Sequence, residues 1–168
     1  MGMYVADLAR MEDFYTRVLG FAVMDRGSLG ETVLVFLSLD PREHHQIILA
    51  SGRPSGDAGF NPINQVSFRL SELAALRQMA ARVRDEGVKD LSAVSHGNAL
   101  SVYFRDPEGN RLELFVDTPW YVRQPLRIPM DLSLPDAELW KWAEAEARRQ
   151  PDFQPVEAWR AKIAGRLK

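Results

Sequence analysis

The chain has 168 residues, 46% of them apolar and 26% charged, with three histidines, no cysteine and a net charge of −2. This length predicts one domain, and the missing cysteines exclude disulfides, thiolate metal sites and cysteine nucleophiles. Because it shows no signal-peptide pattern, no membrane-length apolar run and no basic block, we expect a cytoplasmic protein that binds neither membranes nor nucleic acid.

The first 51 residues predict a strand, a helix and three further strands. Asp7 is placed to cap the helix and Gly20 to end it. The apolar face of this helix consists of Leu8, Met11, Tyr15, Val18 and Leu19. Strand-like runs follow near residues 21–26, 31–39 and 45–50. The segment 52–61 that comes next is rich in glycine and has the composition of a linker.

The same order of elements recurs in residues 62–118. A strand is expected at 64–70, a helix between Ser71 and Gly87, and strands near 91–94, 100–105 and 111–117. The apolar face of this helix consists of Leu73, Leu76, Met79, Ala80 and Val83. The pair Asp40-Pro41 recurs 66 positions later as Asp106-Pro107. The sequence therefore predicts an α+β fold of two βαβββ modules, residues 1–51 and 62–118.

Residues 119–168 have no counterpart in the repeat and form a predicted C-terminal extension. Pro135 and Pro155 are each placed to begin a helix. All four tryptophans lie here: Trp120, Trp140, Trp142 and Trp159. We expect them to pack the extension onto the sheet or onto a second subunit, which favours a homodimer. Stacking of a ligand on Trp120 or Tyr121 is the alternative.

Glu113 is the acidic residue that most needs an explanation. It lies in a strand that is apolar on both faces, so it is expected to be buried, where a carboxylate requires a cation or hydrogen-bond donors. A metal ion would meet this need, and so would an ion pair with Arg69. Arg69 shares a strand face with Ser67 and Gln65, and the polar Gln65 by itself suits any strand surface.

The histidines offer the only imidazole chemistry. The pair His44-His45 opens a predicted strand, and His96 lies in a loop before another. Such residues are commonly solvated loop residues, but histidine is also the side chain that titrates near neutral pH. The residues 106–110, Asp-Pro-Glu-Gly-Asn, predict a tight turn and indicate nothing about function.

The segment 94–113, VSHGNALSVYFRDPEGNRLE, resembles the signature of the type I extradiol ring-cleavage dioxygenases. The matching positions are His96, Val102, Tyr103, Asp106, Pro107, Gly109 and Glu113. The duplicated module resembles the vicinal oxygen chelate superfamily, which also contains glyoxalase I and the bleomycin resistance proteins. The resemblance implies a cupped mixed sheet with helices outside.

The resemblance also implies a site. Such dioxygenases hold Fe(II), or sometimes Mn(II), with two histidines and one glutamate, and bring a catechol-type aromatic diol to O2. On this basis Glu113 is a metal ligand, His45 is the acid/base, and His96 and Tyr103 hold the substrate oxygens. Gln65 occupies the second histidine position, where its carbonyl oxygen could ligate. The repeat spacing places the first ligand one position before Met1.

The repeat separates two classes of metal site. The counterpart of Glu113 in the first module is Ile47, which cannot bind metal, and this favours a three-ligand dioxygenase over a four-ligand glyoxalase. We therefore expect an extradiol-dioxygenase-like metalloprotein. One alternative is a metal-poor binding protein for an aromatic compound or antibiotic, like the bleomycin resistance proteins. Another is a different metal-dependent isomerase or lyase of the superfamily.

Overall fold

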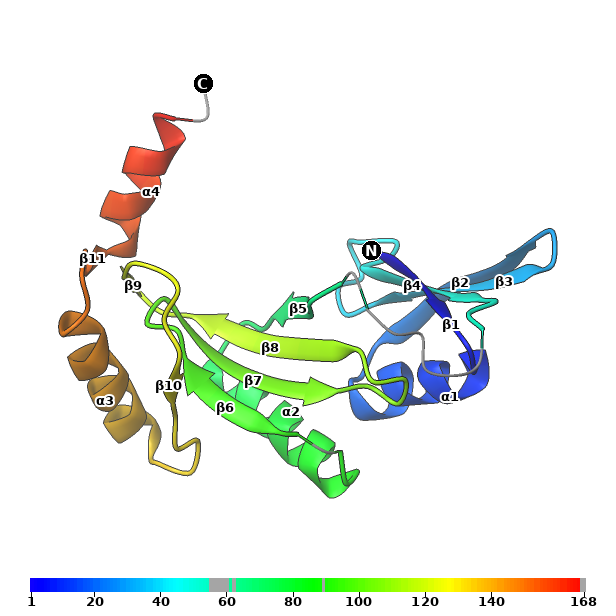
Figure 1. Cartoon of the computed structure of the whole chain (residues 1–168), viewed down its shortest axis with the longest axis horizontal. Helices are drawn as coiled ribbons and strands as arrows, with labels where there is room; N and C mark the ends of the chain where they lie inside the picture. The colour runs from blue at the N-terminus through cyan, green and yellow to red at the C-terminus, as the bar shows by residue number, and fades with distance from the viewer. Residues whose placement is uncertain (55–60, 62, 89, 167–168) are drawn as a thin grey trace. The chain divides into compact units, whose positions relative to one another are not determined.

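The structure is a computed structural model that describes residues 1–54, 61, 63–88 and 90–166 (Figure 1). Residues 55–60, most of the predicted linker, lie outside the described part, as do residues 62, 89, 167 and 168. The chain divides into two compact units. The first unit comprises residues 1–66, 81–89 and 105–111, and the second comprises residues 67–80, 90–104 and 112–168.

The first unit contains a mixed four-stranded sheet (Figure 1). Its elements in chain order are β1 (Gly2–Val5), α1 (Leu8–Asp13), the π-helical turn η1 (Phe14–Val18), β2 (Ala22–Leu29), β3 (Thr32–Ser38) and β4 (Ile47–Ser51). The strand order is β1-β4-β3-β2, with β1 parallel to β4 and the other pairs antiparallel. The predicted strand–helix–three-strand order is confirmed for this module.

The helix of the first unit begins and ends where the sequence predicts. The Asp7 carboxylate accepts a hydrogen bond from the Arg10 backbone N–H at 3.0 Å, so Asp7 caps α1. The last turn widens, since Leu19 N–H bonds to the Phe14 carbonyl five residues back. The apolar face packs against β4, and its buried members include Met11 and Tyr15.

The second unit is built on a five-stranded sheet of order β10-β6-β7-β8-β5. The elements of the second half of the chain are β5 (Val66–Arg69), α2 (Leu73–Asp85), β6 (Ser92–Ser95), β7 (Ala99–Arg105), β8 (Arg111–Asp117), β9 (Trp120–Tyr121), β10 (Ile128–Pro129), α3 (Asp136–Arg148), β11 (Gln154–Pro155) and α4 (Val156–Ala164). The helices α3 and α4 begin after Pro135 and Pro155, as predicted. The short strands β9, β10 and β11 were not predicted, because two-residue strands carry no periodic signal.

The central strands β7 and β8 are buried on both faces. Leu100, Val102 and Leu114 on one face are fully or almost fully buried, and so are Tyr103 and Glu113 on the other. The segment 118–130, which we call the strap, provides part of the cover for Tyr103: the Arg127 guanidinium lies over its ring, and β10 pairs with β6. The expected burial of the Glu113 strand on both faces is therefore confirmed.

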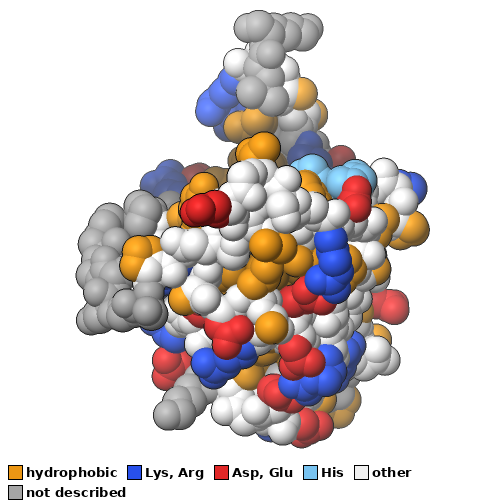
Figure 2. Space-filling view, turned by 90° about the vertical axis from the view of Figure 1, so that its right-hand side faces the viewer, with side chains coloured by type: hydrophobic (Ala, Val, Ile, Leu, Met, Phe, Trp, Pro, Cys, Tyr) orange, Lys and Arg blue, Asp and Glu red, His pale blue; other side chains and the backbone are white. Residues whose placement is uncertain are grey.

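Charged side chains are interspersed on the face drawn in Figure 2, with acidic and basic groups side by side. In the first unit, Arg17 pairs with Asp13 at 2.9 Å and with Glu86 at 2.6 Å. Exposed pairs of this kind contribute little to stability, so the apolar core must supply most of it. No helix of the described residues is long and apolar enough to cross a membrane.

The turn at residues 106–110 belongs to the first unit, where it fixes the start of α1. Glu108 Oε1 accepts hydrogen bonds from the Ala6 and Asp7 backbone N–H groups at 2.6 and 2.8 Å. The buried Asp106 carboxylate accepts from the Asn110 backbone at 2.9 Å and from the Asn110 side chain at 2.7 Å. The sequence predicted the turn itself, but this anchoring role depends on contacts with the other end of the chain.

Burial raises the pKa of Asp106, although its hydrogen bonds act in the opposite direction. The folded state therefore holds the Asp106 proton more tightly than the unfolded chain does, and ionising this carboxyl weakens folding. We compare the unfolding free energy of the wild type with that of Asp106→Asn. This difference should fall as the pH rises from about 3.8, the usual pKa of an aspartate, through the raised pKa of Asp106 in the folded state. Urea denaturation of both proteins across this range measures the difference.

Asp131 supplies a control of opposite sign. The Ser133 hydroxyl and backbone N–H hold the pKa of Asp131 below its usual range, so its ionised form is favoured in the folded state. The wild-type stability relative to Asp131→Asn should therefore rise with pH around 3.8. A difference for Asp106→Asn that also rises with pH would contradict the burial argument.

Candidate functional site

Both carboxylate oxygens of Glu113, in the second unit, accept hydrogen bonds from hydroxyl groups of neighbouring strands. Glu113 lies on β8, and its Oε1 accepts a hydrogen bond from the Tyr103 hydroxyl of β7 at 2.6 Å. The Ser67 hydroxyl of β5 donates to Oε2 at 2.5 Å. Glu113 and Tyr103 are both more than nine-tenths buried. The donors that we expected a buried Glu113 to require are therefore provided by Tyr103 and Ser67.

His96 extends this arrangement from the hairpin between β6 and β7. Its Nε2 lies 2.9 Å from the Tyr103 hydroxyl and 3.6 Å from Glu113 Oε1. Its Nδ1 lies 2.6 Å from the carbonyl oxygen of Leu126 in the strap. A carbonyl oxygen can only accept, so Nδ1 must carry a proton. We call Ser67, Glu113, Tyr103 and His96 the network.

The network can hold its protons in two ways. In the first, Tyr103 donates to an ionised Glu113 and accepts from a His96 imidazolium. In the second, a protonated Glu113 donates to Tyr103, which donates to the bare Nε2 of a neutral His96. Both arrangements contain the same number of protons. A proton can therefore pass between His96 and Glu113 through the Tyr103 hydroxyl without a change in net charge.

Arg69 does not neutralise Glu113, so the predicted ion pair is wrong. The Arg69 Nε lies 3.2 Å from Asp117 Oδ2, and its guanidinium lies over the Phe115 ring at 5.4 Å from the centroid. Arg69 is largely exposed, and an exposed arginine gains more from a solvated carboxylate and an aromatic face than from entering the buried strand surface.

Gln65 and His45 belong to the first unit and are described within it. Gln65 is half-buried and directly precedes β5. His45 is exposed, and its Nδ1 lies 2.9 Å from Nδ1 of His44, while the rings of both histidines stand edge-on to Phe36 at 5.4 Å between centroids. The expected roles of Gln65 as a metal ligand and His45 as an acid/base stay predictions.

The donor set does not fit the metal that the resemblance implies. Among residues 1–54, 61, 63–88 and 90–166, no three His, Cys, Asp or Glu side chains gather closely enough to hold a metal ion. Both oxygens of Glu113 already accept hydrogen bonds from Tyr103 and Ser67. The described residues therefore provide hydrogen-bonding chemistry around Glu113 and not a set of metal ligands.

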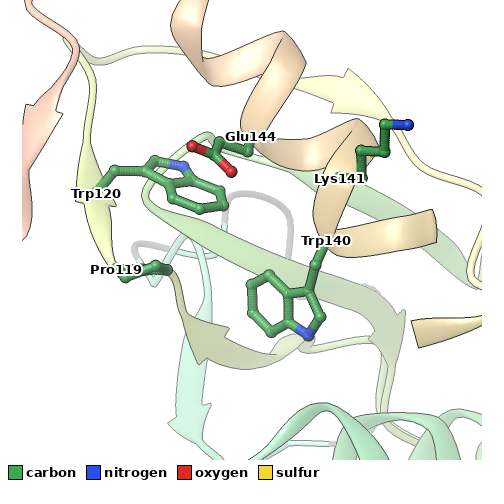
Figure 3. A pocket seen from close by; sticks show the side chains of 5 residues that line it. All are labelled: Pro119, Trp120, Trp140, Lys141 and Glu144. Atoms are coloured by element: carbon green, nitrogen blue, oxygen red, sulfur yellow. The ribbon is translucent and has the colours of Figure 1, made fainter. Parts of the chain in front are cut away.

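The second unit also contains an open pocket of about 470 Å³, lined mainly by apolar surface (Figure 3). Its walls are Pro119, Trp120, Trp140, Lys141 and Glu144, and it shares none of them with the network. The two indoles meet edge to face, with 6.3 Å between ring centroids. Trp120 and Trp140 thus contact each other within the extension, while the packing of the tryptophans onto the sheet or onto a second subunit, ligand stacking by Trp120 and the homodimer stay predictions.

Sequence reasoning found three of the four network residues and missed Ser67 as a partner of Glu113. The alternation of β5 did place Ser67 on the face shared with Gln65 and Arg69, which was the available signal. The contribution of Leu126 could not be found in this way, since it comes from a backbone carbonyl of the irregular strap.

The matched region and the fold define a family. A model of the Glyoxalase/Bleomycin resistance protein/Dioxygenase superfamily matches residues 1–114, and the chain belongs to this superfamily. Among curated proteins, biphenyl-2,3-diol 1,2-dioxygenase 3 of Rhodococcus globerulus is 31% identical over 114 residues, which cover 66% of this chain and 57% of that protein. A second dioxygenase of that organism is matched over 55% of its length. The chain thus spans little more than half the length of these relatives.

Solved structures confirm the fold. A glyoxalase/bleomycin resistance/dioxygenase domain from Frankia sp. EAN1pec superposes with a TM-score of 0.61 at 20% identity, covering 70% of this chain and 94% of that one. A fosfomycin resistance protein of Listeria monocytogenes, solved with Mn(II), superposes with a TM-score of 0.53 at 16% identity, covering 70% and 90%. At such identities the likeness shows the fold alone.

Proposed function

We propose that this chain binds a catechol-type aromatic diol through its network. The observation that carries the proposal is the contact between His96 Nε2 and the Tyr103 oxygen, 2.9 Å apart, behind which Glu113 is buried. Adjacent hydroxyls of a catechol present two donors and two acceptors at a comparable spacing, so one can meet each group. The curated dioxygenase relatives, which are named for such a diol, support this choice of ligand.

The network suits a phenolic ligand because it can give or take a proton. The Leu126 carbonyl fixes a proton on Nδ1 of His96, which directs Nε2 toward the incoming hydroxyl. In the second arrangement Nε2 of His96 is bare, so a phenol can transfer its proton there, and the imidazolium that forms stabilises the phenolate. Orientation and proton transfer of this kind are what the chain's own residues supply.

The bound diol could be cleaved or only held, and a different observation favours each possibility. Ring cleavage with Fe(II) and O2 is favoured by the names of the curated relatives. Sequestration without turnover is favoured by the incomplete donor set among the described residues. Diol binding is common to both, and it is the property that we propose first.

In the first step of the test, catechol is titrated into the protein without oxygen, and calorimetry measures its binding. The protein is then loaded with Fe(II), desalted, analysed for metal by mass spectrometry and exposed to O2 with catechol, and absorbance reports a ring-opened product. The same steps on a form extended upstream examine the ligand position that the repeat places before Met1.

A dioxygenase is supported if either the given chain or its extended form binds catechol, holds about one iron per chain and forms the ring-opened product. Binding without iron supports sequestration. In the dioxygenase case, His45→Ala should abolish product formation while iron stays bound, which would support its predicted acid/base role. If neither form binds catechol, the proposal is overturned.

A further inference from the structure

The strap brings a cation next to the network. Arg127 lies directly before β10, and its guanidinium carbon is 5.8 Å from the centroid of the Tyr103 ring. The neighbouring strap residue Leu126 accepts the Nδ1 hydrogen bond of His96. The strap also lies beyond residues 1–114, the part of the chain that the family model matches. Arg127 is thus a feature of this chain's own extension.

Arg127 uses little of its hydrogen-bonding capacity. Its Nη2 donates to the neutral Ser92 hydroxyl at 3.2 Å, and no carboxylate of the described residues lies within ion-pair distance of it. By contrast Arg123, four residues earlier in the strap, pairs with Asp152 at 2.7 Å. A guanidinium offers five N–H donors in a planar fork that matches a carboxylate. Most of the donors of Arg127 therefore remain available to an anionic group.

The sheet face around Tyr103 is polar, which suits such a group. Ser92 lies directly opposite Tyr103 in the β6–β7 register, and Ser101 lies two residues before Tyr103 on the same face of β7. The Ser101 hydroxyl is fully buried and has no hydrogen-bond partner among the described residues. A buried hydroxyl in this state is destabilising, and an apolar ring substituent placed here would leave it so.

We propose that the diol recognised by the network carries an acidic substituent, a carboxylate, which Arg127 binds beside Tyr103. The substrate class is therefore the carboxylated catechols. This inference rests on the proposed diol binding and adds the residue that selects among diols. A charge-assisted pair between guanidinium and carboxylate should raise the affinity roughly tenfold.

The experiment compares three compounds that share the pair of adjacent ring hydroxyls: catechol, 3,4-dihydroxybenzoate and 2,3-dihydroxybiphenyl. Calorimetry gives the dissociation constant of each for the full chain without added metal. We expect 3,4-dihydroxybenzoate to bind about tenfold more tightly than catechol, and this ratio to fall with added salt. In Arg127→Gln the ratio should approach one, and Arg127→Lys should restore part of it, since lysine keeps the charge but not the fork.

Arg123→Gln is the matched control, since it removes a strap arginine that has its own carboxylate partner, and it should keep the wild-type ratio. The outcomes separate the two proposals. If catechol binds but the wild type shows no preference for the carboxylate, or Arg127→Gln keeps that preference, the carboxylate site is overturned while diol binding stands. If none of the three probes binds, diol binding itself fails and the carboxylate site falls with it.

Discussion

Replacing Tyr103 by Phe is expected to weaken catechol binding about tenfold or more and to lower the free energy of unfolding by roughly 1–3 kcal/mol. The substitution keeps the buried ring but removes the hydroxyl that joins Glu113 Oε1 to His96 Nε2. Each of these two buried or half-buried groups then loses a hydrogen-bond partner, which is costly away from water. Calorimetric titration and urea denaturation measure the two effects.

Tyr4→Phe is the control for this variant, because Tyr4 is 64% exposed. It should change neither the catechol affinity nor the stability by a measurable amount. Catechol affinity in Tyr103→Phe within twofold of the wild type would show that the hydroxyl does not take part in binding. An unchanged stability would mean that the link between Glu113 and His96 contributes nothing to folding.

Gly97→Ala should destabilise the fold by about 2–4 kcal/mol, combining a strained backbone with a steric clash. Gly97 has φ of +75°, and a Cβ there would lie 2.2 Å from Val122 Cγ2 in the strap. The strap is tied to this hairpin by the Thr118 hydroxyl, which donates to the Gly97 carbonyl at 2.8 Å. Displacing the strap also moves the Leu126 carbonyl from His96, so catechol affinity should fall as well.

Two further variants separate strain from clash. Gly109 has φ of +80°, but a Cβ there meets nothing within 4 Å, so Gly109→Ala reports the backbone cost alone, roughly 1 kcal/mol. The double variant Gly97→Ala with Val122→Ala removes the clashing methyl group and should show a favourable coupling in a double-mutant cycle. If Gly97→Ala and Gly109→Ala lowered the free energy of unfolding equally, the strap would move away from the new Cβ without destabilising the fold.

The motif in residues 96–113 contains residues that take part in different structures. The resemblance of this segment to the dioxygenase signature implied that His96, Tyr103 and Glu113 act together, and the structure joins them through one hydroxyl. The same motif includes Asp106, whose carboxylate instead organises a turn in the first unit. A motif thus gathers residues with different tasks, because the two ends of one hairpin face different surroundings.

The sequence by itself determined the two βαβββ modules, the helix caps and the buried strand of Glu113. These follow from local periodicity, from turn residues and from the internal repeat, all of which are written along the chain. Tertiary structure alone decided the partners of the polar groups that bond to distant segments of the chain. Arg69 bonds to Asp117 and not to Glu113, and His96 is held by a carbonyl 30 residues away. Hydrogen bonds and ion pairs depend on distances of a few ångströms between segments remote in sequence, and no local pattern specifies those distances.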